Sequence, residues 1–172
     1  KNYKLPDTPH LSGLRPMTPE DVPGVHKLLT TYLDKFQLKV MFEPDEIGHW
    51  LLPRPGVVDS FVMCDKDSGE VTDLCSFYHL PSNILQHKDT LLYAAYSFYN
   101  VATSVTWIEL MRSCLILAKS GGADVFNALN LMDNEEFLTD LKFGFGDGNL
   151  QYYLYNWACP KLKSKEVGIV LL

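Results

Sequence analysis

The amino-acid sequence predicts a mixed α/β domain, in which a mostly antiparallel, twisted sheet is flanked by helices. Two long segments carry apolar residues at helical spacing, and aromatic or β-branched runs typical of strands lie between and after them. Two of the strand runs are separated by a short polar turn, which predicts a hairpin. Strands that alternate with helices around such a hairpin are typical of a mixed α/β layer fold.

The composition limits the class of protein before any motif is considered. The chain has 172 residues, of which 47% are hydrophobic and 21% are charged, so disordered, collagen-like and coiled-coil proteins are excluded. This length predicts a single folded domain. The formal net charge of −6 argues against a nucleic-acid partner and against an anionic membrane surface.

The four cysteines indicate a reducing, cytoplasmic setting. None of them forms a CxxC pair, and no histidine lies at metal-ligand spacing from another, so we predict neither a metal site nor a disulfide framework. Residues 1–10 lack the apolar core of a signal peptide. No run approaches the ~20 apolar residues of a membrane-spanning helix, so no transmembrane segment is expected.

The N-terminal elements follow from turn and capping residues. Residues 1–13 are predicted to be a linker because prolines and a glycine interrupt a polar stretch, and the folded domain is expected over 14–172. A short strand is predicted at 14–17. The sequence TPED at 18–21 predicts a helix start, since threonine can cap, proline fits the first helical position and two acids face the positive helix end. Apolar residues then repeat at helical spacing as far as Phe36.

The middle of the chain is predicted to be rich in strands. A second short helix is expected over 44–51. The apolar runs 57–64 and 71–80 flank the polar turn 65–69 and therefore predict the hairpin. The aromatic run 91–101 is predicted to be the next strand of the sheet.

The last third alternates short helices and strands. Residues 108–117 predict a helix that Gly121 and Gly122 end. Residues 125–129 predict a short buried strand, and 133–141 a short helix capped by an aspartate or an asparagine. Further strands are predicted at 143–145, 150–157 and 166–171.

The order of elements from Trp107 onward resembles the second half of an acetyltransferase of the GNAT superfamily. That resemblance implies a glycine-bearing loop before the central helix, whose backbone N–H groups would hold the pyrophosphate of coenzyme A. Residues 100–106 (NVATSVT) occupy this position and contain neither glycine nor arginine. We therefore expect a GNAT-like fold that does not bind coenzyme A in the usual way.

Longer motifs resemble the C-terminal half of eukaryotic N-myristoyltransferases, and together they cover essentially the whole chain. The run from Lys142 to Trp157 is the most specific of them. The motifs are GLRPM (13–17), CSFYHLPS (75–82), AAYSFYNVAT (94–103), DVFNAL (124–129), KFGFGDGNLQYYLYNW (142–157) and VGIVLL (167–172).

The resemblance implies an enzyme that transfers myristate from myristoyl-CoA to the N-terminal glycine amine of proteins. Family members contain two GNAT-like halves, of which the N-terminal half binds myristoyl-CoA and supplies the oxyanion hole. This chain would be the second, cofactor-free half, and residues 1–13 would be the linker from the missing half. Its implied partners are that N-terminal half and peptides or proteins that begin with glycine. No tightly bound cofactor and no metal are implied, because myristoyl-CoA is a co-substrate held mainly by the missing half.

The resemblance assigns the catalytic base to the α-carboxylate of Leu172. A free α-carboxyl has a pKa of about 3.5 and an α-amine one of about 7.8, so the proton transfer would cost roughly 6 kcal/mol if neither value shifted. Desolvation of both groups reduces this mismatch, although their mutual attraction opposes the reduction. The apolar run 169–172 is suited to draw the carboxylate into the interior.

The remaining predicted site residues would line the peptide groove. The turn 146–149 carries an aspartate expected to face a basic or polar substrate side chain. Each residue also has a structural interpretation, such as burial for the leucines or the tyrosine and backbone hydrogen bonding for the asparagine. The predicted substrate-binding residues are Ser82, Tyr96, Asn127, Asp147, Gly148, Leu150 and Leu171.

Two other functions are compatible with parts of the sequence. A non-enzymatic peptide-binding module derived from a GNAT fold would also have lost the coenzyme A loop. A self-sufficient small-molecule acyltransferase would need that loop, and residues 100–106 argue against it. No histidine is assigned a catalytic role, because none is paired with an acid in the sequence pattern.

Overall fold

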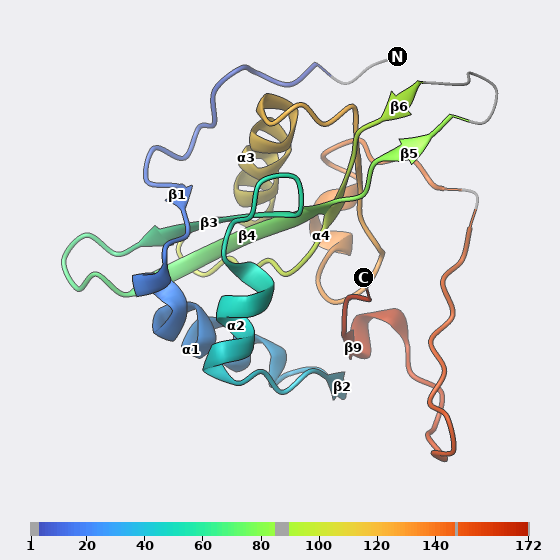
Figure 1. Ribbon diagram of the computed structural model, residues 1–172. Helices are drawn as coiled ribbons and strands as arrows, with labels where there is room; N and C mark the ends of the chain where they lie inside the picture. The colour runs from blue at the N-terminus through green and yellow to red at the C-terminus, as the bar shows by residue number, and fades with distance from the viewer. Residues whose placement is uncertain (1–3, 85–89, 147, 172) are drawn as a thin grey trace.

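A five-stranded sheet organises the molecule, as the computed structural model in Figure 1 shows for residues 4–84, 90–146 and 148–171. All neighbouring strands pair antiparallel except the last two, which are parallel. The predicted mixed α/β fold with a mostly antiparallel sheet is therefore confirmed. The strands lie in the order β1 (Arg15–Pro16), β3 (Val58–Cys64), β4 (Val71–His79), β7 (Ala94–Ser97) and β8 (Val125–Asn127).

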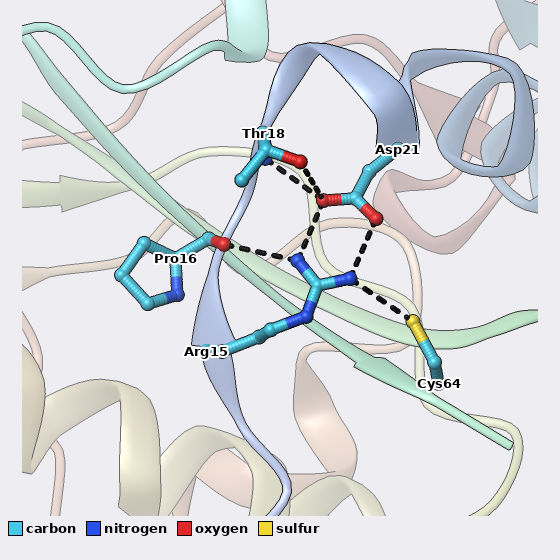
Figure 2. A network of polar contacts seen from close by, with 5 residues as sticks. All are labelled: Arg15, Pro16, Thr18, Asp21 and Cys64. Carbon is cyan, nitrogen blue, oxygen red and sulfur yellow. Dashed lines mark hydrogen bonds and ion pairs between the residues drawn. The ribbon is translucent and has the colours of Figure 1, made fainter. Parts of the chain in front are cut away.

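The predicted helix start is present and is tied to the first strand by a polar network. A 3₁₀ turn, η1 (Pro19–Asp21), leads into α1 (Val22–Leu33). Both terminal nitrogens of Arg15 donate to the Asp21 carboxylate at 2.7 Å, as Figure 2 shows. The backbone N–H and the hydroxyl of Thr18 donate to the same carboxylate at 2.8 and 3.0 Å. Thr18 thus begins the helix as a donor, and these hydrogen bonds hold the pKa of Asp21 at about 2.

The hairpin of β3 and β4 follows the predicted boundaries closely. Its strands pair from Val58 opposite Tyr78 to Cys64 opposite Val71. In the turn, the Asp65 carboxylate accepts from two backbone N–H groups and one hydroxyl. The helix α2 (Pro44–Leu51) has the predicted bounds.

The aromatic run 91–101 forms two strands instead of the single strand predicted. β6 (Leu91–Leu92) pairs with β5 (Ser82–Asn83), whereas β7 continues the main sheet. Beyond Ser97, one extra residue bulges, because Ser97 lies opposite Phe77 and Val101 lies opposite Leu74. Side chains satisfy the interrupted ladder: the Ser76 hydroxyl donates to the Tyr99 carbonyl at 2.6 Å, and Asn100 accepts from the Ser76 N–H at 3.0 Å.

The central helix α3 (Trp107–Ser120) extends the prediction at both ends. Its cap residue Thr106 accepts from the N–H of Glu109, whose carboxylate accepts from Thr106 in return. Gly121 ends the helix as predicted. The strand β8 was predicted to be buried, but Val125 and Asn127 are exposed because β8 is an edge of the sheet. The helix α4 (Glu135–Leu138) is shorter than predicted.

The C-terminal predictions were wrong in their strand content. No strand forms in the described residues 143–146 and 148–157, because no other strand lies beside them to accept their backbone hydrogen bonds. Figure 1 shows the chain after α4 running away from the sheet before it returns. The last strand is only β9 (Val167–Gly168), which follows the 3₁₀ turn η2 (Ser164–Glu166) and pairs in parallel with β2 (Leu38–Lys39).

The two faces of the sheet are covered by different helices. Leu74 of β4 belongs to the apolar cluster under α1 and α2, together with Leu29 and Ile47. The alternate residues Cys75 and Phe77 belong to the cluster under α3 and α4. The sheet is therefore buried on both faces, and its outer β8 edge remains open.

Candidate functional site

A group of tyrosines lies on the α1–α2 face of the sheet, next to the C-terminal tail. Tyr78 and Tyr96 are opposite each other in the β4–β7 register, and their rings stack with centroids 5.2 Å apart. Tyr99 comes from the bulge that follows β7, and Tyr152 packs against the same apolar cluster from the segment after α4. We call these four residues the tyrosine cluster.

The tail, residues 167–171, is fixed to this cluster through its backbone. The Tyr152 hydroxyl donates to the carbonyl oxygen of Ile169 at 2.8 Å. The N–H of Val170 donates to the Tyr99 hydroxyl oxygen at 3.2 Å. Upstream, a Cβ on Gly168 would lie 3.0 Å from the Phe36 ring, so glycine allows the tail to approach the turn between α1 and β2 this closely.

An apolar cavity lies under the tail, with a volume of about 250 Å³. Its wall combines tail residues, the bulge, α2 and the chain between β2 and α2, and none of the described residues that line it is charged. An apolar wall of this kind disfavours water around the tail backbone. The lining residues are Val40, Phe42, Trp50, Phe98, Tyr99, Ile169, Val170 and Leu171.

Burial disfavours the charged form of three phenols, those of Tyr78, Tyr99 and Tyr152. It raises the pKa of Tyr99 to about 12, and it raises the pKa values of Tyr78 and Tyr152 above the ordinary value of 10. These side chains therefore act near neutral pH as hydrogen-bonding groups without charge. They orient neighbouring groups and do not serve as bases.

A larger open groove of about 2180 Å³ begins at the exposed edge of β8. Asn127 forms one wall, and Gly148 and Leu150 lie on the opposite segment. Tyr152 also lines this groove, so one residue touches both the groove and the tail. Asn127 lies opposite Tyr96 in the β7–β8 register, which links the groove edge to the tyrosine cluster.

The other predicted site residues are distributed around this arrangement. Ser82 is exposed on the β5–β6 hairpin, with its hydroxyl 3.4 Å from the Leu80 carbonyl, and it lines neither hollow. Leu171 lies on the wall of the tail cavity and is half exposed. Asp147 and Leu172 lie outside the described residues. Their roles and those of the groove residues stay predictions.

The loop at the expected coenzyme A position is filled by a side chain of the protein. The backbone N–H groups of Thr103 and Ser104 donate to one oxygen of Asp73 at 2.8 and 3.0 Å. The Ser104 hydroxyl binds the other oxygen of this fully buried carboxylate. Sequence reasoning noted the missing glycine but not this carboxylate. An acid within a predicted strand was the available signal.

The structure also contains a histidine–aspartate pair that the sequence pattern does not predict. The Nε2 atom of His79 lies 2.7 Å from a carboxylate oxygen of Asp59. The two residues lie diagonally across the β3–β4 hairpin, where Asp59 is opposite Phe77. The hairpin register would have revealed this pair.

The described part of the chain contains neither a metal-binding cluster nor a membrane-spanning helix. In that part, no three histidine, cysteine or acidic residues are grouped closely enough to hold a metal ion. No helix there has the length and apolar character required to cross a bilayer. All four cysteines are free thiols, and Cys75 and Cys114 are buried.

Comparison with known proteins identifies relatives along the whole chain. A family model described as the C-terminal domain of myristoyl-CoA:protein N-myristoyltransferase matches residues 1–170. A glycylpeptide N-tetradecanoyltransferase 2 of Bos taurus is 52% identical over 99% of this chain and 34% of its own length. The Drosophila melanogaster glycylpeptide N-tetradecanoyltransferase is 48% identical over 100% of this chain and 36% of its own. The chain thus spans about a third of the length of these curated relatives.

Solved structures agree with the sequence comparison. Saccharomyces cerevisiae N-myristoyltransferase with bound myristoyl-CoA superposes with a TM-score of 0.78 at 33% identity, over 84% of this chain and 40% of that one. A Trypanosoma brucei acetyltransferase has a TM-score of 0.58 at 15% identity, over 82% of this chain and 98% of that one, which shows a shared fold alone. The predicted GNAT-like fold is therefore confirmed.

Proposed function

Because this chain belongs to the N-myristoyltransferase family and matches its C-terminal domain, we propose that it forms the peptide-binding part of an acyltransferase. The complete enzyme would transfer myristate from myristoyl-CoA to the N-terminal glycine amine of proteins. The match over residues 1–170 carries this proposal, because it includes the groove and nearly all of the tail. The cytoplasmic location expected from the sequence stays a prediction.

Acyl-CoA binding is assigned to the N-terminal part that this sequence lacks. The support is the Asp73 carboxylate, which occupies the N–H groups of Thr103 and Ser104. A phosphate at this position would meet a buried negative charge and no free donor from these two residues. Myristoyl-CoA is then a co-substrate, and this chain needs no tightly bound cofactor.

The N-terminal part is also the proposed partner of the aromatic segment, which we define as residues 143–146 and 148–157. Phe145, Tyr155 and Trp157 of this segment are at least 73% exposed. Large exposed apolar side chains in one stretch mark an interaction surface. This chain covers only 34% of the length of the Bos taurus relative. The remaining part of such a protein would supply the partner for that surface.

The peptide groove is assigned to the hollow that begins at β8. Asn127, Gly148 and Leu150 would line it, and Leu171 on the wall of the tail cavity would be near the reacting end. Tyr96 lines neither hollow, but it lies opposite Asn127 in the β7–β8 register and is proposed to contact the peptide from there. Ser82 is proposed to contact a more distant part of the substrate from the β5–β6 hairpin. Asp147 is proposed to face a basic or polar substrate side chain.

We assign the general base to the α-carboxylate of Leu172, which would take a proton from the glycine ammonium. Attack of the free amine on the thioester carbonyl then forms the amide bond and releases coenzyme A as the thiol. The apolar wall beneath Ile169, Val170 and Leu171 supports this assignment. Partial desolvation there raises the carboxylate pKa and lowers the ammonium pKa, which brings the two closer.

A chimera tests the function. This chain replaces the matching C-terminal part of the Drosophila melanogaster relative, with which it shares 48% identity. We expect transfer of myristate to a peptide that begins with glycine, no transfer to the alanine-initial control, and no transfer by the chain alone. Peptide binding without transfer by the chimera, beside an active parent enzyme, would favour the non-enzymatic module. Transfer by the chain alone would favour a self-sufficient acyltransferase.

Two C-terminal variants of the chimera test the base. Removal of residues 171–172 should lower kcat by about 10²–10⁴-fold, the usual contribution of a general base. Leu172→Ala retains the α-carboxylate and should keep most of the activity. Equal loss in both variants would contradict a role for the main-chain carboxylate.

A further inference from the structure

One peptide unit of the tail is held at both ends by phenols. The carbonyl oxygen of Ile169 and the N–H of Val170 belong to the same peptide bond. Tyr152 donates to the oxygen at 2.8 Å, and Tyr99 accepts from the nitrogen at 3.2 Å. Because a peptide unit is planar, contacts at both ends fix its orientation as well as its position.

Tyr99 is a rigid holder for this peptide unit. It is 2% exposed, and its ring packs against Phe98 and Phe42 with centroid distances of 4.8 and 5.3 Å. The Ser76 hydroxyl donates to its carbonyl at 2.6 Å and accepts from its N–H at 3.0 Å. The bulge therefore fixes the Tyr99 backbone and aims its side chain at Val170.

Tyr152 connects the same peptide unit to the groove. It lines the large hollow, while its hydroxyl reaches Ile169 in the tail. Its neighbours Gln151 and Tyr153 are exposed, so this contact anchors an otherwise open part of the aromatic segment. Tyr152 thus touches both the proposed peptide groove and the tail.

We propose that Tyr99 and Tyr152 are positioning residues, which clamp the Ile169–Val170 peptide unit and thereby place the α-carboxylate of the chain against the substrate amine. This inference rests on the proposed function of the tail. The proposed base belongs to Leu172, two positions after Val170, and two residues span at most about 7 Å. A change in the orientation of the Ile169–Val170 peptide unit would therefore move the proposed base.

The clamp is expected to operate across the pH range in which the substrate amine titrates. An α-amine has a pKa of about 7.8, whereas burial raises the pKa of Tyr99 to about 12 and that of Tyr152 above its ordinary value. The titratable group that acts on the Tyr99 and Tyr78 phenols from the aromatic segment is Tyr152, which is itself neutral in this range. Changes of rate between pH 7 and 9 therefore report on the amine and the base.

Tyr→Phe substitutions in the chimera test the clamp. Tyr99→Phe and Tyr152→Phe each remove one hydrogen bond, and we expect kcat at pH 7 to fall about 3- to 10-fold with less than a twofold change in the peptide KM. The deficit should shrink toward pH 9, because a growing fraction of the amine is already deprotonated without help from the base. A defect that is only structural would not depend on pH in this way. Tyr93→Phe, half exposed between β6 and β7, is the control and should retain full activity.

Amide hydrogen exchange on this chain provides a readout independent of activity. The Val170 amide should exchange at least fivefold faster in Tyr99→Phe than in Tyr93→Phe. Faster exchange together with an unchanged kcat at every pH would overturn the clamp while leaving the proposed base intact. Unchanged exchange in Tyr99→Phe would also overturn the clamp. A chimera that keeps full activity without residues 171–172 would overturn the proposed base itself.

Discussion

The helix α3 and the aromatic segment are both rich in large apolar side chains, but they place them in opposite environments. Leu110, Met111 and Ile116 of α3 are fully buried against the sheet and its neighbours. In the aromatic segment, Phe145 and Tyr155 are almost fully exposed, although this segment carries the most specific motif of the chain. Apolar content therefore does not show whether a stretch is core. The two stretches differ in whether this chain supplies a surface that covers them.

The physical cause is the availability of neighbours. α3 forms its own backbone hydrogen bonds and meets a sheet that already has an apolar face. The aromatic segment follows α4, and among the described residues it pairs with no strand. Its motif is therefore better explained by contacts outside this chain, as the proposed function requires. Four experiments test this difference between the two regions.

The largest expected effect is the difference in lost stability between substituting a buried and an exposed aromatic residue. Phe137 is fully buried between Trp107 and Phe143, so Phe137→Ala should lower the free energy of unfolding by about 3–5 kcal/mol. Trp157→Ala, at 73% exposure, should lower it by less than about 0.5 kcal/mol. Urea unfolding of this chain measures both. Similar losses would mean that the aromatic segment packs against the body in solution.

The next effect concerns the carboxylate that fills the loop before α3. Asp73→Ala leaves the N–H groups of Thr103 and Ser104 without their acceptor and should destabilise the chain by about 1–3 kcal/mol. Asp140→Ala, at an exposed position, is the matched control and should have little effect. Sodium formate should restore part of the melting temperature of Asp73→Ala and leave the control unchanged. A variant as stable as the parent would remove the support for Asp73 as the internal anion.

Acid should weaken the hydrogen-bond network between β1 and α1, with a smaller loss of stability than that expected for Asp73→Ala. The pKa of Asp21 is lowered to about 2, so its contribution is complete above the unfolded value of 3.8 and is lost as the pH falls through 2. The shift corresponds to about 2 kcal/mol at most. The free energy of unfolding, measured between pH 5 and 2, should fall less steeply in Asp21→Asn than in the parent chain. Identical pH slopes would show that Asp21 titrates normally.

The smallest effect on stability is expected in the aromatic segment itself. Replacing Phe145, Tyr155 and Trp157 together by serine should shift the melting temperature of this chain by less than about 2 °C, because all three are exposed. The same substitutions in the chimera should lower its melting temperature by at least 5 °C, since there the side chains would contact the N-terminal part. Equal small shifts in both proteins would argue against that interface.

Several parts of the fold could be predicted from residues that act locally. The Thr18 start, the Asp65 turn and the Thr106 cap set boundaries through hydrogen bonds within a few residues. The β3–β4 hairpin and α2 could be predicted for the same reason. The split of the strand 91–101 could not be predicted, because it depends on pairing with different strands, β6 with β5 and β7 with β4.

The candidate site was predicted less completely than the fold. The motif residues Asn127, Gly148 and Leu150 do line one groove, while Ser82 lies apart from it. Tyr99 and Tyr152 were not selected, because aromatic residues in apolar runs are normally core residues. Their hydrogen bonds to the tail exist only after distant segments meet.

The amino-acid sequence is enough to identify the family, the order of most elements and the absence of glycine from the loop 100–106, because these depend on residue identity and local spacing. The tertiary structure alone decided that Asp73 fills that loop, that His79 meets Asp59, and that two phenols hold one peptide unit of the tail. Each of these contacts joins residues at least 17 positions apart. Such contacts are set by strand register and by packing, which no local pattern in the sequence specifies.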